Sequence, residues 1–207
     1  MVMFHGGGTS YRGAEPSARL LGERYHVVLV AYDGFNPSEP ETTFVSPMDE
    51  ARRLGDYIVE RYGGKIDILY GISYGCRILM EVLADKRLTI TAAIADGMSL
   101  NDYPNIKSTW GKNLYGRATW QSWKNQDYAL IGKKTDYSLF ARTHMFLWYG
   151  IKGLVDKKLS ANLGKLKAQG YPFEEKIFTD LGHGGLAGEQ PRRFMEEVTL
   201  AYQQATT

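Results

Sequence analysis

Long apolar runs, a secretory leader pattern and dense basic stretches are all missing from this sequence of 207 residues. No segment approaches the roughly 18 uninterrupted apolar residues that a membrane-spanning helix needs. The N-terminus, MVMFHGGGTS, has neither the basic region nor the apolar region of a signal peptide. Lys and Arg number 25 against 23 Asp and Glu, and no run is basic enough to neutralise a row of phosphates. We therefore expect a cytoplasmic protein with no membrane span and no nucleic-acid partner.

Cysteine is almost absent as well, since Cys76 is the only one in the chain. A single cysteine cannot form an internal disulfide, so nothing in the sequence calls for an oxidising compartment. We expect Cys76 to be a small buried apolar residue.

What the sequence does contain is an alternation of strand-length apolar runs and helical patterns, which is typical of βαβ units around a mostly parallel sheet. The runs VVLVAY and MFLWY are continuously apolar, as expected for strands covered by helices on both faces. The length and the 43% hydrophobic content suit one domain over residues 1–207. The predicted strands are residues 1–4, 26–32, 65–70, 90–95, 144–149 and 174–179.

The clearest helix start lies at Pro47, because Ser46 and Asp49 have capping-box spacing and a proline in the first turn needs no amide donor. Apolar residues then recur at helical spacing. These residues are Met48, Ala51, Leu54, Ile58 and Val59. Further helices are predicted over residues 14–23, 74–84, 157–169 and 190–204.

Residues 99–143 break the alternation, with many tyrosines and tryptophans among polar residues and glycines. Long segments without regular structure are uncommon in compact domains unless they bind or cover something. We therefore predict an aromatic-rich lid or cap insertion here, with packing against the body as the alternative role of its aromatic residues.

The strongest motif is Gly71-Ile72-Ser73-Tyr74-Gly75, which follows the apolar run KIDILY and precedes the helical pattern CRILMEVLA. A serine in such a strand–turn–helix is held in a strained conformation that exposes its hydroxyl, and the flanking glycines avoid clashes. We predict that Ser73 is a catalytic nucleophile.

A second motif, His5-Gly6-Gly7-Gly8, comes directly after the first predicted strand. Glycines there let backbone amides face the site and stabilise an oxyanion together with the amide after the nucleophile. The rival interpretation, a phosphate-binding loop, lacks the G-K-[ST] sequence and the G-x-G-x-x-G spacing. We predict an oxyanion hole at Gly7, Gly8 and Tyr74.

A serine nucleophile needs a base, and the chain has only four histidines. His5 belongs to the glycine loop, and His26 and His144 begin predicted strands. Only His183 lies in a glycine-flanked loop at the carboxyl end of a late strand. We predict His183 as the general base.

The three motifs HGGG, GISYG and GHGG, in this order, resemble the α/β-hydrolase superfamily over nearly the whole chain. The resemblance implies a sheet of about six strands with helices on both faces. The sequence departs from the family pattern in opening at what would be the fold's third strand, so we expect the usual first hairpin to be missing. The resemblance also implies an acyl-enzyme mechanism on an ester, thioester, amide or related carbonyl substrate.

The acid that orients the base is less clear from the sequence. In the superfamily it usually follows the penultimate strand, where this chain has Gly153 at the expected place and Asp156 as the nearest acid. Asp156 is also suited to cap a helix. Asp96, at the end of the preceding strand, occupies a position that some members use, and Asp180 or a site without a strong acid are further alternatives. We expect Asp156, with Asp96 as the alternative.

These residues predict a serine hydrolase that cleaves a small carboxylic ester, with a small-molecule ester-type substrate as its partner. We expect no cofactor and no metal. A thioesterase or carbon–carbon bond hydrolase would use the same residues. A protein that keeps the fold for small-molecule binding, without turnover, is the alternative from a different class.

Overall fold

The computed structural model describes residues 1–7, 9–33, 35, 42, 44, 46–100, 135–152 and 158–207. Its centre is a six-stranded sheet with the order β2-β1-β3-β4-β5-β6, in which every neighbouring pair is parallel. The strands are β1 (Val2–Phe4), β2 (Val28–Val30), β3 (Lys65–Ile72), β4 (Thr89–Asp96), β5 (His144–Gly150) and β6 (Glu174–Phe178). All six predicted strands are confirmed.

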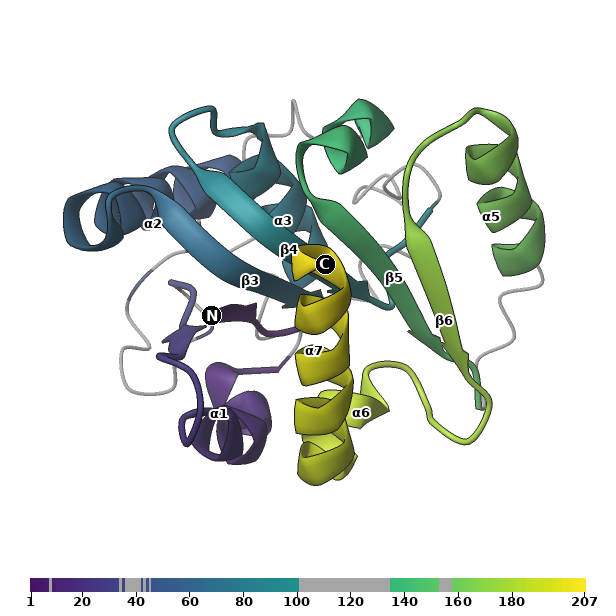
Figure 1. Ribbon diagram of the computed structural model, residues 1–207. Coiled ribbons are helices and arrows are strands. Elements are labelled where there is room, and N and C mark those ends of the chain that lie inside the picture. The colour runs from purple at the N-terminus through teal and green to yellow at the C-terminus, as the bar shows by residue number, and fades with distance from the viewer. Residues whose placement is uncertain are drawn as a thin grey trace.

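Helices cover both faces of this sheet (Figure 1). One face packs against α1 (Glu15–Leu21) and α7 (Pro191–Thr206). The other packs against α2 (Pro47–Tyr62), α3 (Gly75–Ala84) and α5 (Leu159–Ala168). The remaining described elements are η1 (Tyr11–Ala14), η3 (Tyr137–Arg142) and the short α6 (Gly185–Glu189).

The buried side chains form two apolar layers, one on each face of the sheet. Neighbouring residues of a central strand point into opposite layers, as the period of a strand requires. Leu69, for example, belongs to the layer under α2, α3 and α5, whereas Tyr70 belongs to the layer under α1 and α7. This explains why the central strands read as continuous apolar runs in the sequence.

Helix α2 begins as predicted. The Ser46 hydroxyl accepts a hydrogen bond from the amide of Asp49 at 3.1 Å, and Pro47 occupies the first helical position. Of its predicted apolar face, Ala51, Leu54 and Ile58 are buried. The prediction was wrong for Met48 and Val59, which are exposed because they lie at the margins of the stripe that faces the sheet.

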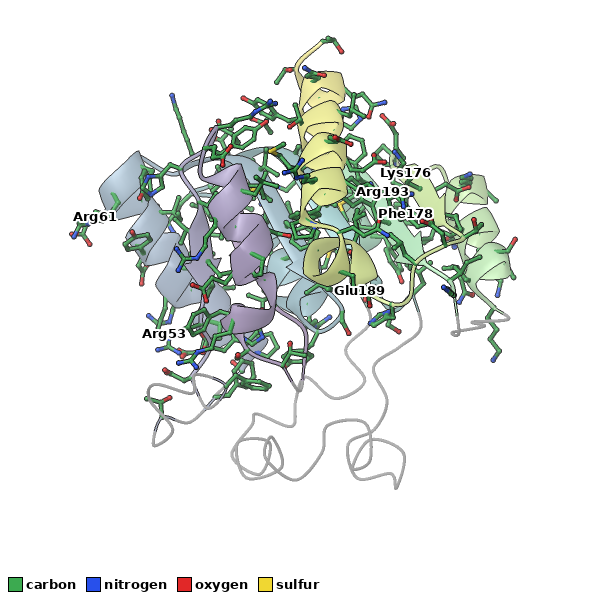
Figure 2. The ribbon with its side chains drawn as sticks, turned by 90° about the horizontal axis from the view of Figure 1, so that it is seen from below. Arg53, Arg61, Lys176, Phe178, Glu189 and Arg193 are labelled. Atoms are coloured by element: carbon green, nitrogen blue, oxygen red, sulfur yellow. The ribbon has the colours of Figure 1, made fainter. Side chains whose placement is uncertain are left out.

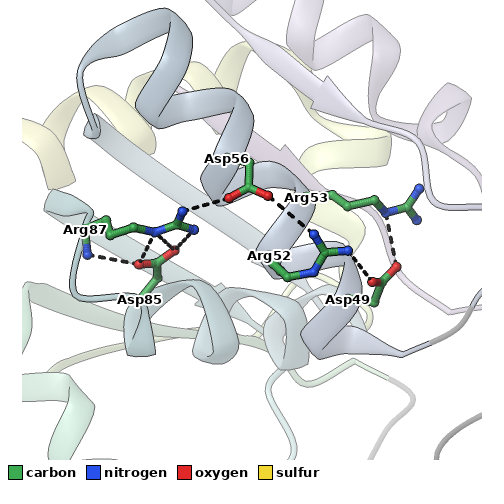
Figure 3. Close-up of polar contacts among 6 residues, drawn as sticks. All are labelled: Asp49, Arg52, Arg53, Asp56, Asp85 and Arg87. Carbon is green, nitrogen blue, oxygen red and sulfur yellow. Dashed lines mark hydrogen bonds and ion pairs between the residues drawn. The ribbon is translucent and has the colours of Figure 1, made fainter.

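A chain of ion pairs follows the outer side of α2 and connects the middle of this helix to neighbouring segments (Figure 3). Its members, in order, are Asp85, Arg87, Asp56, Arg52, Asp49 and Arg53. Arg53 continues the chain to Asp33, just after β2, at 2.7 Å. The network therefore fixes α2 against the loop before β4 and the loop after β2.

The register brings the carboxyl ends of the strands together at one edge of the sheet. Phe4 pairs with Gly71, Ile72 pairs with Asp96, and Asp96 pairs with Trp148. The loops that follow β1, β3 and β4 therefore start side by side. In parallel sheets this edge is where binding and catalytic groups gather.

The predicted insertion over residues 99–143 lies mostly outside the described residues, which omit 101–134. Its two flanks are described, and the Tyr137 hydroxyl donates to the carbonyl of Leu100 at 3.1 Å. The chain thus leaves and re-enters the described fold at neighbouring points, next to the end of β4. Whether the insertion acts as a lid stays a prediction.

Candidate active site

Ser73 sits in the turn between β3 and α3 with a backbone φ of 52°. Among the described residues no other non-glycine residue has a positive φ. For a residue with a Cβ atom, this left-handed conformation costs about 1–2 kcal/mol, and it persists only where the surroundings enforce it. The conformation is the one that the sequence predicted for a nucleophile at a strand–helix turn.

The two glycines around Ser73 are required by close backbone packing. A Cβ atom on Gly71 would lie 2.8 Å from the carbonyl oxygen of Gly75, and one on Gly75 would lie 2.7 Å from the carbonyl oxygen of His5. Both distances are shorter than a carbon atom can approach an oxygen, so any larger residue would push α3 away from β1 and β3. The tight fit holds the turn in its strained shape.

The predicted oxyanion loop lies directly beside this turn. A Cβ atom on Gly6 would be 3.5 Å from Cβ of Ser73, so the backbone of the loop lies close to Ser73. The Thr9 hydroxyl donates to the carbonyl of Gly6 at 2.8 Å and ties the loop back on itself. Tyr74, the other predicted contributor, is the N-cap of α3. Gly7 is described, whereas Gly8 lies outside the described residues.

His5, the first residue of the glycine loop, is fixed by its contacts with Tyr32. It is buried, and burial lowers the pKa of its imidazole to about 4, so the ring is neutral at pH 7. The ring stacks on Tyr32 with centroids 3.9 Å apart, and the Tyr32 hydroxyl donates to the His5 carbonyl at 2.8 Å. A neutral histidine fixed in this way holds the glycine loop in position.

His183 follows β6 in the loop that leads to α6, and its imidazole rests on the backbone of Gly97. A Cβ atom on Gly97 would come within 2.4 Å of Cε1 and 2.6 Å of Nδ1 of that ring. Gly97 also has a φ of 68°, so two independent reasons require glycine there. Partial burial lowers the pKa of His183, which keeps it neutral and able to accept a proton at pH 7.

The loop of His183 also touches the turn that carries Ser73. A Cβ atom on Gly184 would lie 2.3 Å from Cδ1 of Ile72, the residue before Ser73. The amide of Ser73 in turn donates to the carbonyl of Asp96 at 2.7 Å, next to Gly97. The surroundings of Ser73 and His183 therefore meet at the carboxyl ends of β3 and β4. Within the described ranges, no direct hydrogen bond joins the two side chains.

Asp180, a further candidate for the acid, pairs with Arg193 of α7. It forms two hydrogen bonds with Arg193 at 2.5 and 3.3 Å, and Arg193 lies over the ring of Phe178 (Figure 2). This partnership lowers the pKa of the exposed Asp180 carboxyl. Asp180 thus ties the start of the His183 loop to α7, and the hydrogen bonds of its carboxylate among the described residues go to Arg193.

Asp96 ends β4 and is buried at 2% exposure. Its carboxylate accepts a hydrogen bond from the Tyr70 hydroxyl at 2.8 Å. Burial raises its pKa to about 7, while the Tyr70 hydroxyl acts in the opposite direction. Asp156, the first choice for the acid, lies outside the described residues.

Two features of the site were not predicted from the sequence. These are the hydrogen bond from Tyr70 to Asp96 and the contact of the His183 ring with the backbone of Gly97.

Within the described ranges, no group of three or more His, Cys, Asp or Glu side chains could hold a metal ion. None of the described helices is both long enough and apolar enough to cross a membrane.

Comparisons with known proteins agree with this architecture. The model of a family described as "Alpha/beta hydrolase family" matches residues 1–197, and the chain belongs to this family. A search of curated proteins gave no match. The parallel six-stranded sheet covered by helices is thus the fold of this family.

Solved structures are similar in fold at low sequence identity. A thermophilic esterase from Thermogutta terrifontis superposes with a TM-score of 0.72 at 14% identity, covering 100% of this chain and 90% of the esterase. MenH from S. aureus gives 0.68 at 14% identity, with 100% and 94% covered. An esterase from Exiguobacterium antarcticum gives 0.65 at 15% identity, with 98% and 91% covered. At these identities the likeness extends to the fold alone.

Proposed function

We propose that this member of the alpha/beta hydrolase family is a serine hydrolase that cleaves small carboxylic esters through an acyl-enzyme. The observation that carries the proposal is the left-handed backbone of Ser73 at the strand–helix turn, beside the glycine loop. Backbone conformations that cost free energy cluster at functional sites. The esterase names of two of the similar structures favour ester substrates.

In the proposed reaction, Ser73 Oγ attacks the carbonyl carbon of the ester and His183 takes the hydroxyl proton. The negative charge on the former carbonyl oxygen is stabilised by the amide of Tyr74 and by an amide of Gly7 or Gly8. The bond to the leaving alcohol then breaks, and His183 returns the proton to that alcohol. Water repeats the sequence on the acyl-enzyme and releases the carboxylic acid.

The lowered pKa of His183 suits this role, because a base must be neutral before it can accept the proton. A carboxylate is expected to orient the ring and to stabilise the imidazolium once it forms. We propose Asp156 for this position and keep Asp96 as the alternative.

The proposal is tested by treating the protein with a fluorophosphonate probe and with a panel of esters of graded acyl length. We expect labelling at Ser73 and turnover that depends on acyl length. His183→Ala should lower turnover by several orders of magnitude. His144→Ala is the matched control, because His144 pairs with Glu174 at 2.5 Å.

Two results would contradict the proposal. A larger kinetic loss for His144→Ala than for His183→Ala, with both variants folded, would show that the base is assigned wrongly. A protein that binds the esters without labelling or turnover would support the binding-protein alternative instead.

A further inference from the structure

The peptide that joins Asp96 and Gly97 contacts both reacting residues of the proposed mechanism. The Asp96 carbonyl accepts the amide of Ser73 at 2.7 Å, and the α-carbon of Gly97 supports the ring of His183. A displacement of this one peptide would therefore move the nucleophile relative to the base. Whatever fixes the peptide fixes the geometry of the reaction.

The described contacts of this peptide identify what holds it. The Gly97 amide donates to the carbonyl of Trp148 at 2.8 Å, which fixes it toward β5. The Cys76 thiol lies 3.4 Å from the Asp96 carbonyl and 3.1 Å from the carbonyl of Gly71, a weak contact from α3. The Asp96 side chain is held by the Tyr70 hydroxyl.

Tyr70 is itself held firmly, so it can fix the position of the Asp96 side chain. Its ring is fully buried and packs edge-on against Phe194 of α7, with centroids 4.8 Å apart. Burial, and then the neighbouring Asp96, raise the pKa of Tyr70 well above its usual value, so the hydroxyl stays protonated and donates. Within the described ranges, the carboxylate of Asp96 has no cationic partner, which makes this neutral donor its main support.

We propose that Tyr70 is a positioning residue, which acts through Asp96 to hold the Asp96–Gly97 peptide in register with Ser73 and His183. The inference rests on the proposed function and adds a residue to it that touches neither the substrate nor the reacting atoms. It holds whichever aspartate orients the base, because the Asp96 backbone is what connects the two reacting residues.

The test compares Tyr70→Phe with Tyr149→Phe. Both changes remove one buried tyrosine hydroxyl at the same end of the sheet, since the Tyr149 hydroxyl donates to the carbonyl of Met98 at 3.1 Å. We expect Tyr70→Phe to lower kcat by about tenfold or more while KM stays within about twofold, because small misplacements of reacting groups cost rate. Tyr149→Phe should leave both constants within about twofold.

Equal kcat values for Tyr70→Phe and the wild type would overturn the inference while leaving the proposed function intact. Equal losses of kcat in the two variants would also overturn it, because the effect would then be a general cost of removing a hydroxyl. A wild type that fails to hydrolyse esters and is not labelled at Ser73 would remove the proposed function and this inference with it.

Cys76→Ala provides a second variant if Tyr70→Phe does not fold. It removes a weak donor to the Asp96 carbonyl, which also accepts the amide of Ser73, and it leaves the Tyr70 contact with the Asp96 side chain in place. We expect kcat to fall by about two- to fivefold at unchanged KM, a smaller effect because a thiol is a weak donor. An unchanged kcat in a folded Cys76→Ala variant, with Tyr70→Phe unfolded, would count against the inference.

Discussion

The imidazole of His183 rests on the α-carbon of Gly97, so closely that a Cβ atom there would come within 2.4 Å of the ring. Glycine is the one residue that leaves this space, and it also accepts the positive φ of 68° at low cost. The residue after β4 therefore supports the His183 ring, beside the strained turn of Ser73.

Gly97→Ala should therefore displace His183 and lower kcat by about a hundredfold or more. The matched control is Gly63→Ala, at the end of α2, where φ is also positive at 60° but a Cβ atom would meet nothing within 4 Å. Both variants should lose on the order of 1–2 kcal/mol of stability from the backbone conformation alone. Ester hydrolysis and urea unfolding of both variants separate the two effects. Similar kcat values in the two variants would show that His183 does not depend on Gly97.

The identity of the acid is decided by substituting each candidate with asparagine. An aspartate that orients the base should lose about three to four orders of magnitude in kcat on this change. A helix cap should lose almost nothing, since asparagine caps about as well as aspartate. We predict the large loss for Asp156→Asn and a small one for Asp96→Asn. The reverse result would assign the role to Asp96, and two variants within about tenfold of wild type would exclude both.

Asp96 should also make stability depend on pH, because its pKa is raised to about 7 in the folded protein. Between about pH 4 and pH 7 the folded state then holds a proton that the unfolded state has lost, so stability falls as pH rises through this range. Asp96→Asn keeps an acceptor for Tyr70 and removes the titration. Its stability relative to wild type should rise over this range by on the order of a few kcal/mol.

Urea unfolding at pH 4, 5.5 and 8 measures this difference. If the difference in free energy of unfolding between wild type and Asp96→Asn does not change with pH, the pKa of Asp96 is not raised in the folded protein.

Much of the fold could be predicted because its signals are local. The strand β3 and the helix α2 each carry their own periodicity and end signals, and the glycines at positions 71 and 75 mark the turn between β3 and α3. The predicted ends of a strand were less accurate where neighbouring strands determine them. For example, β2 lies at an edge of the sheet and spans only Val28–Val30 instead of residues 26–32. The five-residue α6 was missed because it is short and contains two glycines.

The candidate site also has a part that local sequence predicts and a part that only the fold determines. Ser73 and His183 stand in recognisable local sequences, whereas the support that surrounds them depends on strand register. Tyr70 and Asp96 are 26 residues apart and meet only because β3 pairs with β4. The contact of Gly97 with His183 joins two loops that are distant in sequence. The hydrophobic pattern of a single segment cannot predict contacts between segments that are far apart in the sequence.

The most direct test of the whole account is Ser73→Ala, with Ser99→Ala, an exposed serine shortly after β4, as the matched control. We predict that Ser73→Ala abolishes both fluorophosphonate labelling and hydrolysis of an activated ester, while Ser99→Ala retains both. The Tm of Ser73→Ala should stay close to wild type, because the hydroxyl serves chemistry and the turn is strained rather than stabilising. Wild-type turnover by a folded Ser73→Ala variant would contradict the account.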